Sequence, residues 1–200
     1  MLKKYDNYIC LNKDNSVFIN NLDKHFIIYN QNFYYSYCYV LYNLNTISNS
    51  ELKYSRKIYL NNNTDIVFNI SDVHIEIDFE LLGVNEYNIF FEIFNHIKEN
   101  IILNKSIFFI VCLHFNEIKK ELLDVFYNFL DEPKIKFIFI TNQVSFLNNL
   151  LLKNCYIKKV KNSELISDYN NNYKNNVNKI KNIIINRNIE LFKIREIRNN

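Results

Sequence analysis

The stretch that decides the fold reads HFIIY at residues 25–29, NQNFYYSY at 30–37 and CYVLYNL at 38–44. The first segment has the length and apolar character of a buried strand, and the last has the character of a helix. We therefore predict a strand over 25–29, an eight-residue turn over 30–37 and a helix over 38–47.

This strand, turn and helix follow in the same order as in a Walker A phosphate-binding loop, but the residues that bind phosphate in such a loop are missing. Such a loop needs glycines, so that backbone N–H groups can wrap the phosphates, and a Lys that neutralises them. Here Asn30, Phe33 and Tyr35 take the glycine places, while Ser36 and Tyr37 take the places of the Lys and the Ser/Thr. Side chains with a Cβ do not readily adopt the left-handed conformations that glycines give such loops. We therefore predict no open phosphate cradle, and we expect the aromatic side chains to pack across the place of the nucleotide.

Composition bounds the class of protein. Two hundred residues suit one domain, or one domain with a small appendage, and 48% hydrophobic residues suffice for a core. No run reaches the roughly 18 apolar residues of a membrane span, and the N-terminus lacks the apolar core of a signal peptide. We expect an intracellular protein without a membrane partner, in the host cytoplasm or nucleus if the source is viral.

The four cysteines, Cys10, Cys38, Cys112 and Cys155, are far apart and show no C-x-x-C spacing. This spacing favours neither a metal site nor a disulfide framework. Cys38, Cys112 and Cys155 stand among apolar neighbours, so we interpret them as packed thiols. For Cys112, core packing is favoured over a nucleophile pair with His114.

The remaining chain alternates between strand and helix patterns. Residues 107–113 form a continuous apolar run, which is typical of a strand buried on both faces of a parallel sheet. Residues 86–100 carry one apolar stripe at helical spacing. Strands are predicted at 57–60, 65–70, 73–78, 107–113, 135–141 and 156–160, and helices at 86–100, 117–130, 144–152, 164–170 and 174–197. This alternation predicts a three-layer α/β domain with a parallel sheet.

One group of polar residues and one single histidine are candidates for a site. His74, Glu76 and Asp78 alternate with apolar residues and share one strand face, from which they could bind a metal or serve as acid and base. We interpret them instead as a solvated strand face. His25 opens a buried strand and is interpreted as a boundary or capping residue. We assign no catalytic, cofactor-binding or metal-binding residue.

Charge is unevenly distributed along the chain. Residues 151–200 hold eleven Lys/Arg against four Asp/Glu, although the net charge of the whole chain is only +3. Such a basic segment can bind nucleic acid or an acidic partner. A solvated helix face is the alternative, because the predicted helix over 174–197 places its Lys and Arg residues beside an apolar stripe.

Several segments now fall into one family order. Residues 25–30 are similar to a strand that enters a Walker A loop, and residues 108–118 are similar to a Walker B strand. Residues 137–142 are similar to a sensor 1 strand, and residues 150–155 are similar to a Ser-Arg-Cys segment. Residues 71–78 are similar to a strand found in one branch of the small subunits of the same family. Over residues 22–162 the chain resembles the ATPase domain of clamp-loader small subunits, the replication factor C type of AAA+ protein. The resemblance implies a P-loop NTPase-like (AAA+) fold, with a degenerate AAA+ domain at 1–162 and a basic, helical, lid-like segment at 163–200.

Most of the residues that carry ATPase activity in that family are replaced in this chain. The Walker B acids fall on Leu113 and His114, neither of which can hold Mg²⁺ as a carboxylate does. The arginine finger falls on Asn154, and Asn142 alone keeps its identity as the sensor 1 residue.

His114, with Asn116 and Glu117 nearby, is accordingly interpreted as a worn Walker B end rather than as a new catalytic histidine. The resemblance implies a non-catalytic subunit without a cofactor that acts in DNA replication by contacts with other clamp-loader-like subunits or a sliding clamp. Three alternatives remain: a nucleic-acid-binding module that uses residues 153–200, a structural remnant, and an enzyme with an unrecognised site.

Overall fold

The computed structural model of the chain describes residues 23–52, 56–59, 67–102 and 107–161. The chain divides into two units, Met1–Lys161 and Asn162–Asn200, and all described residues belong to the first. The predicted helices over 164–170 and 174–197, the basic segment 163–200 and Cys10 therefore lie outside the described residues.

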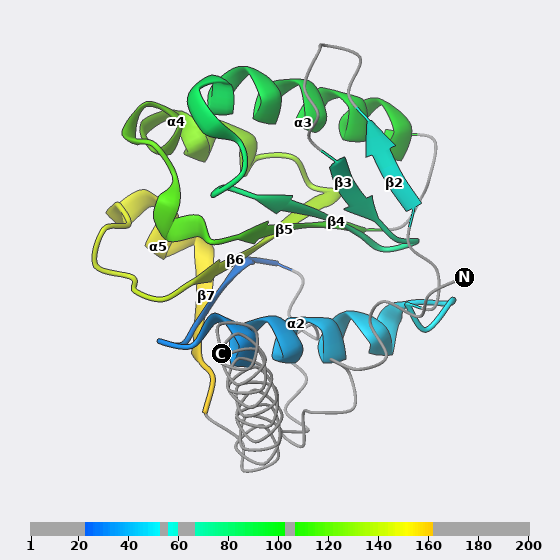
Figure 1. Cartoon of the computed structure of the whole chain (residues 1–200), viewed down its shortest axis with the longest axis horizontal. Helices are drawn as coiled ribbons and strands as arrows, with labels where there is room; N and C mark the ends of the chain where they lie inside the picture. Colours follow the sequence, from blue (N-terminus) through cyan, green and yellow to red (C-terminus); the bar gives the residue numbers. More distant parts are fainter. Residues whose placement is uncertain (1–22, 53–55, 60–66, 103–106, 162–200) are drawn as a thin grey trace, which may run out of the picture. The chain divides into compact units, whose positions relative to one another are not determined.

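A seven-stranded sheet forms the centre of the first unit, with the strand order β2-β3-β4-β5-β6-β1-β7 (Figure 1). Strands β4, β5, β6, β1 and β7 pair in parallel, while β2 and β3 add an antiparallel hairpin at one edge. The strands are β1 (His25–Tyr29), β2 (Arg56–Tyr59), β3 (Val67–Ile70), β4 (His74–Asp78), β5 (Phe108–Leu113), β6 (Ile135–Thr141) and β7 (Cys155–Lys159). Each predicted strand is present, with bounds that differ by a residue or two at some ends.

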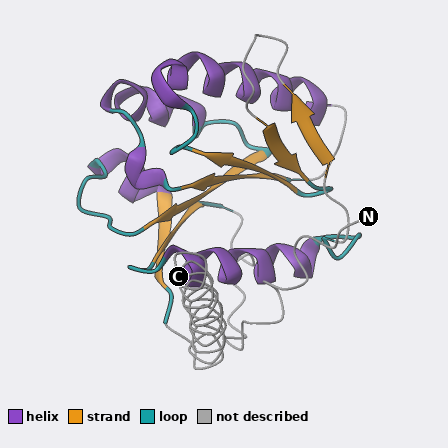
Figure 2. Ribbon diagram, viewed as in Figure 1, coloured by secondary structure: helices purple, strands orange, loops and turns teal. Residues whose placement is uncertain are grey.

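Helices cover both faces of this sheet, so the predicted three-layer α/β fold is confirmed (Figure 2). Helix α2 (Phe33–Ile47) lies on one face, and α3 (Glu86–Ile102) and α4 (Lys120–Val125) lie on the other (Figure 1). A short helix, α5 (Asn149–Asn154), leads into β7. Because β1 is inserted between β6 and β7, the segment after β1 emerges in the middle of the parallel strands.

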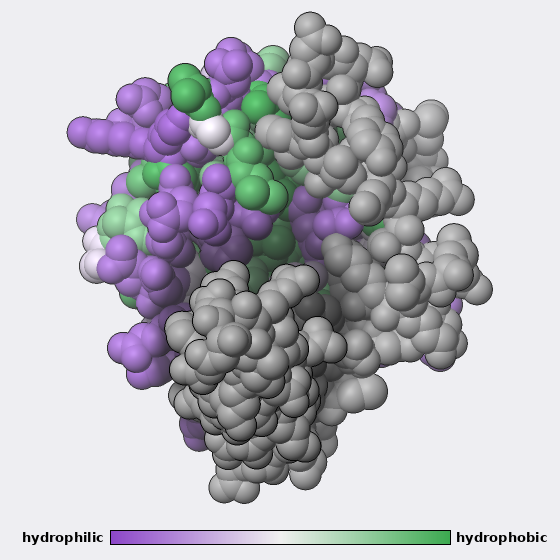
Figure 3. All heavy atoms as spheres, viewed as in Figure 1, coloured by the Kyte–Doolittle hydropathy of each residue, from purple (hydrophilic) through white to green (hydrophobic). Residues whose placement is uncertain are grey.

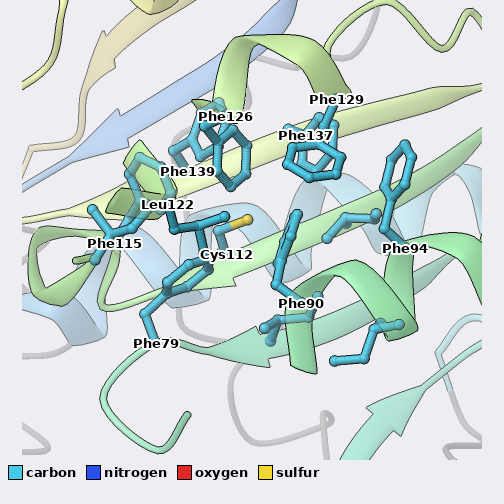
Figure 4. Close-up of a cluster of buried hydrophobic side chains, with 14 of the residues drawn as sticks. Phe79, Phe90, Phe94, Cys112, Phe115, Leu122, Phe126, Phe129, Phe137 and Phe139 are labelled. Carbon is cyan, nitrogen blue, oxygen red and sulfur yellow. The ribbon is translucent and has the colours of Figure 1, made fainter. Parts of the chain in front are cut away.

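The main core lies between the sheet and helices α3 and α4, and phenylalanine dominates it (Figure 4). The predicted apolar stripe of α3 is buried here, and so is the inward face of β5 through Ile110 and Cys112. Rings from α3, from β6, from the turns around α4 and from the residue after β4 meet in edge-to-face or tilted contacts, and they are Phe79, Phe90, Phe94, Phe115, Phe126, Phe129, Phe137 and Phe139. Such contacts add about 0.5–1.5 kcal/mol each beyond the burial of their area.

The helix predicted over 117–130 is wrong in its extent. The chain forms a 3-10 turn at Phe115–Glu117, the α-helix α4, and a second 3-10 turn at Phe126–Phe129. Between the first turn and α4 the backbone is extended at Lys119, whose N–H donates to both carboxylate oxygens of Glu86 at 3.1 and 3.3 Å. This long-range cap fixes a break that helical periodicity does not reveal. Burial raises the pKa of Glu86, and the bond from Lys119 opposes that shift.

The helix predicted over 144–152 is shifted toward the C-terminus. Helix α5 begins after Asn148, whose side chain accepts a hydrogen bond from the N–H of Leu151 at 2.8 Å. Asparagine is a preferred residue at this capping position, so the cap sets the helix start.

The surface of the described part carries some large apolar side chains. The face in Figure 3 shows hydrophobic patches among mainly hydrophilic residues in the region of α3 and α4. Leu81, Val84, Tyr87 and Phe91 are among the exposed apolar residues. In the described residues, no helix is both long enough and apolar enough to cross a bilayer.

Candidate functional site at the carboxyl edge of the sheet

The turn after β1 is shorter than predicted. Helix α2 begins at Phe33 rather than at residue 38, so only Asn30, Gln31 and Asn32 separate it from the strand. Asn32 caps the helix, because its side-chain oxygen accepts a hydrogen bond from the N–H of Tyr34 at 3.0 Å. A sequence without glycine thus takes the right-handed helical conformation at once and does not build the wide, left-handed loop of a phosphate site.

Asn30 ties this turn to the neighbouring strands. Its side-chain oxygen accepts from the N–H of Asn32 at 2.7 Å, and its amide nitrogen donates to the carbonyl of Val160 at 2.8 Å. Its own N–H donates to the carbonyl of Thr141, at the end of β6, at 3.3 Å. Backbone N–H groups at the start of α2, which a phosphate would bind, are therefore bonded to asparagine side chains instead.

Aromatic rings connect the start of α2 with the end of β5. The ring of Phe33 stacks on the imidazole of His114, with centroids 4.0 Å apart and planes 22° apart. Phe33 also stacks on Tyr37, at 5.6 Å. The segment aligned with Walker A thus touches the segment aligned with Walker B directly, ring against ring. The prediction that aromatic side chains pack across this place is confirmed for Phe33 and Tyr37.

The interpretation of the β4 face as solvated is wrong. His74 is fully buried and Glu76 is 4% exposed, because β4 is an inner strand and α2 covers this face. The hydroxyl of Tyr37 on α2 donates to Glu76 at 2.6 Å, and the side-chain amide of Asn69 donates to the other carboxylate oxygen at 3.1 Å. Nε2 of His74 lies 3.7 Å from Glu76, and Ser71 Oγ lies 2.7 Å from His74 Nδ1. These residues form a buried polar layer between helix and sheet.

The third residue of that predicted face, Asp78, belongs to a different group. It ends β4 and lies beside His114, which follows β5, with 2.8 Å between the aspartate oxygen and His114 Nδ1. Glu80 reaches the same nitrogen at 3.7 Å. One ligand-type atom from each of these three residues lies within 4.8 Å of the other two.

The imidazole of His114 pairs with Asp78 and not with the side chains of Asn116 and Glu117, its neighbours in the sequence. The amide of Asn116 donates to Glu117 at 2.7 Å, whereas the imidazole turns toward β4. The backbone of His114 is left-handed, with φ 48° and ψ 43°, and this conformation sets the direction of the side chain. Glu80 was missed in the sequence analysis, although its position two residues after the end of a strand was a usable signal.

The two remaining residues singled out by the family resemblance lie apart from Asp78, Glu80 and His114. Asn142, aligned with the sensor 1 residue, is exposed directly after β6. Asn154, aligned with the arginine finger, is exposed at the end of α5, where the chain enters β7 at the amino edge of the parallel strands.

The three described cysteines are buried, as predicted. Burial raises the pKa of the Cys38 and Cys155 thiols to about 12, and it raises the pKa of Cys112 well above its usual value. A thiol with a raised pKa holds little thiolate at neutral pH, so these residues are packing groups rather than nucleophiles.

His25 is a boundary residue, as predicted, and it bonds on both sides. Its Nδ1 accepts the N–H of Phe137 at 3.0 Å, which requires an unprotonated nitrogen, and its Nε2 lies 3.1 Å from the carbonyl of Leu130. The neutral tautomer with the proton on Nε2 satisfies both contacts. Burial lowers the pKa of His25 to about 4, and the bond to Leu130 only partly opposes this shift.

The strand order defines the class of fold. The strand aligned with sensor 1, β6, lies between the strands aligned with Walker A (β1) and Walker B (β5), and β7 follows on the outer side of β1. Together with helices on both faces, this is the arrangement of a P-loop NTPase-like sheet, and it confirms the predicted fold class.

Comparison with known proteins adds little to this assignment. No family model matches the sequence, and no curated protein matches it. Among solved structures, the chain is similar to C. elegans PCH-2, with a TM-score of 0.44 and 10% sequence identity. The match covers 78% of this chain and 40% of that protein's chain. A likeness at this level carries no argument about family or activity, so the fold class rests on the strand order.

Proposed function

We propose that the first unit is a degenerate AAA+ domain that does not bind or hydrolyse ATP and acts through protein contacts as a clamp-loader-like subunit in DNA replication. The observation that carries the first half of the proposal is the closed turn after β1. There Asn30 and Asn32 bond to the N–H groups of the turn, and Phe33 stacks on His114.

Nucleotide binding at this place would be costly for two reasons. A phosphate would have to replace the asparagine side chains at the N–H groups and move the Phe33 ring away from His114. The turn itself supplies no positive charge for that exchange, because residues 25–40 contain neither Lys nor Arg. Phosphate-binding loops of active enzymes supply a Lys and a carboxylate-bound Mg²⁺ for this purpose.

Calorimetry tests this half of the proposal directly. Full-length protein at roughly tens of micromolar is titrated with Mg-ATP, a regime that detects micromolar affinity. An active P-loop ATPase in the same buffer serves as the positive control. We expect no heat of binding for this protein, and micromolar binding with measurable turnover would overturn the proposal.

The replication half of the proposal is supported by the ordered resemblance of residues 22–162 to clamp-loader small subunits. This resemblance predicts that the partners are a sliding clamp or other clamp-loader-like subunits, so the native protein should co-purify with one of them. Recovery of the protein without either partner from replicating cells would overturn this assignment and leave the ATP result untouched.

A nucleic-acid-binding module is the second candidate, and the outer edge of the sheet favours it. On edge strand β7 the side chain of Tyr156 is 51% exposed, and Lys158, Lys159 and Lys161 follow within five residues. Aromatic rings stack on bases, and lysines neutralise phosphates. Fluorescence anisotropy with single-stranded DNA at several salt concentrations tests this reading. Lys159→Gln should lower the salt slope by about 0.7 if that lysine contacts one phosphate.

A further inference from the structure

The carboxyl ends of β4 and β5 bring together three side chains that share an ability to ligate metal ions. Asp78 ends β4, Glu80 follows it by two residues, and His114 directly follows β5. The two strands are parallel neighbours, with Asp78 in register with Leu113. In open α/β sheets, ligands bind outside the carboxyl ends of the strands. We propose that Asp78, Glu80 and His114 bind a divalent transition-metal ion, with Zn²⁺ as the reference case.

The spacing of the ligand atoms fits one shared ion. Zinc binds imidazole nitrogen and carboxylate oxygen at about 2.0–2.2 Å, so two ligands of a tetrahedral site lie about 3.4 Å apart. His114 Nδ1 lies 2.8 Å from the nearest oxygen of Asp78 and 3.7 Å from that of Glu80. These two distances bracket the expected separation, and all three ligand atoms lie within 4.8 Å of one another, so side-chain movements of about an ångström would place them around one ion.

The charge of the group also favours a cation. Two carboxylates face a single imidazole here, and within the described residues neither Asp78 nor Glu80 forms an ion pair with a Lys or an Arg. Two like charges on one turn repel each other, and a cation between them relieves that repulsion. A bound divalent ion would balance the two negative charges that His114 alone leaves uncompensated.

Neighbouring groups hold the ligands in their present directions. The Phe33 ring lies against the imidazole of His114 at 4.0 Å, and the carbonyl of His114 accepts the N–H of Glu117 at 2.9 Å. The side chain of Asp78 accepts the N–H of Glu80 at 3.1 Å, which fixes the turn that carries both carboxylates. Outer contacts of this kind orient ligands and raise the affinity of metal sites.

The donor set selects the class of metal. One imidazole nitrogen with two carboxylates suits zinc and other first-row transition ions, whereas Mg²⁺ and Ca²⁺ prefer oxygen ligands alone. Three protein ligands leave one position of a tetrahedral ion for water or for a group of a partner. The proposed metal site lies where the resemblance places the end of the Walker B strand, and it does not depend on whether the protein joins a clamp loader.

The test uses untagged full-length protein that has been treated with chelator and titrated calorimetrically with ZnCl₂ and, separately, with MgCl₂. We expect one Zn²⁺ per chain and at least tenfold weaker binding of Mg²⁺.

Three variants, Asp78→Asn, Glu80→Gln and His114→Phe, each remove one ligand, and the last keeps a ring for Phe33 to stack on. Each should weaken Zn²⁺ binding by at least tenfold, since even outer-sphere changes cost 10- to 100-fold. The matched control, Asp124→Asn, removes an exposed carboxylate on α4 and should bind as the wild type does.

Circular dichroism checks that each variant is folded. If His114→Phe does not fold, the two carboxylate variants still decide the question. Absence of Zn²⁺ binding to the wild type at roughly 100 μM, or equal binding by the wild type and by Asp78→Asn and Glu80→Gln, would overturn the proposal. The second result would place the ion elsewhere in the chain. ATP titration reports on the turn after β1, so the two proposals fail separately.

Discussion

Stability should fall in acid because His25 is buried as a neutral imidazole. Its pKa is lowered from 6.5 to about 4 in the folded protein, mainly by burial. The unfolded chain therefore binds a proton between these values that the folded protein does not bind, so lowering the pH favours unfolding. His25 contributes its full stabilisation above pH 6.5, loses it as the pH falls toward 4, and loses no more below that. The lowering of the pKa from 6.5 to about 4 corresponds to about 3 kcal/mol.

The assay is urea unfolding of full-length protein at half-unit intervals from pH 7 to pH 4. His25→Gln is the test variant, because its side-chain oxygen can accept from the N–H of Phe137 and its amide can donate to the carbonyl of Leu130 without titrating. His96→Gln, at an exposed position of α3, is the matched control for loss of a histidine.

The informative quantity is the free energy of unfolding of the control minus that of His25→Gln. This difference should fall by about 3 kcal/mol from pH 7 to pH 4, with a slope near 1.4 kcal/mol per pH unit. The other titrating groups are common to both variants and cancel, except His96, whose contribution is measured separately as the wild type minus the His96→Gln control. A flat difference, or an NMR titration of the folded His25 imidazole near pH 6.5, would refute the reasoning.

Three further substitutions probe the turn, the buried polar layer and the core, each by urea unfolding at pH 7. Asn32→Ala removes the cap of α2 and should cost about 1 kcal/mol; an unchanged midpoint would mean that this cap does not hold the helix start. Tyr37→Phe removes the hydroxyl that donates to buried Glu76 and should cost about 1–3 kcal/mol; the double change Tyr37→Phe with Glu76→Gln should then cost less than the sum of the single changes. Phe126→Ala, at a fully buried ring, should cost about 3–5 kcal/mol, and a loss below 1 kcal/mol would contradict the packing.

The sequence by itself determined which segments form the buried strands of the sheet. Residues 25–29, 107–113 and 135–141 are apolar runs of strand length, and a strand buried on both faces has no polar side to show. The sequence also showed that the glycines and the Lys of a phosphate-binding loop are missing. Such a loop needs these residue types themselves, so their absence can be seen without the tertiary structure. Both features depend on local sequence, and the structure confirms the strands.

Only the tertiary structure decided what covers each face. The alternation in β4 correctly placed His74 and Glu76 on one side, but period two does not distinguish water from a helix. Helix α2 covers that side, and Tyr37, 39 positions away in the chain, supplies the hydroxyl that Glu76 needs. A polar face buried in this way reads in the sequence like a solvated one.

The grouping of Asp78, Glu80 and His114 was likewise decided in three dimensions. It depends on the parallel pairing of β4 with β5 and on the left-handed backbone at His114. Asn32 caps α2 locally, but the turn before it is fixed by bonds from Asn30 to β6 and to the residue after β7, over more than 100 positions. Local propensity determines which residues form strands and helices, whereas contacts between distant segments determine where they end and which side chains meet.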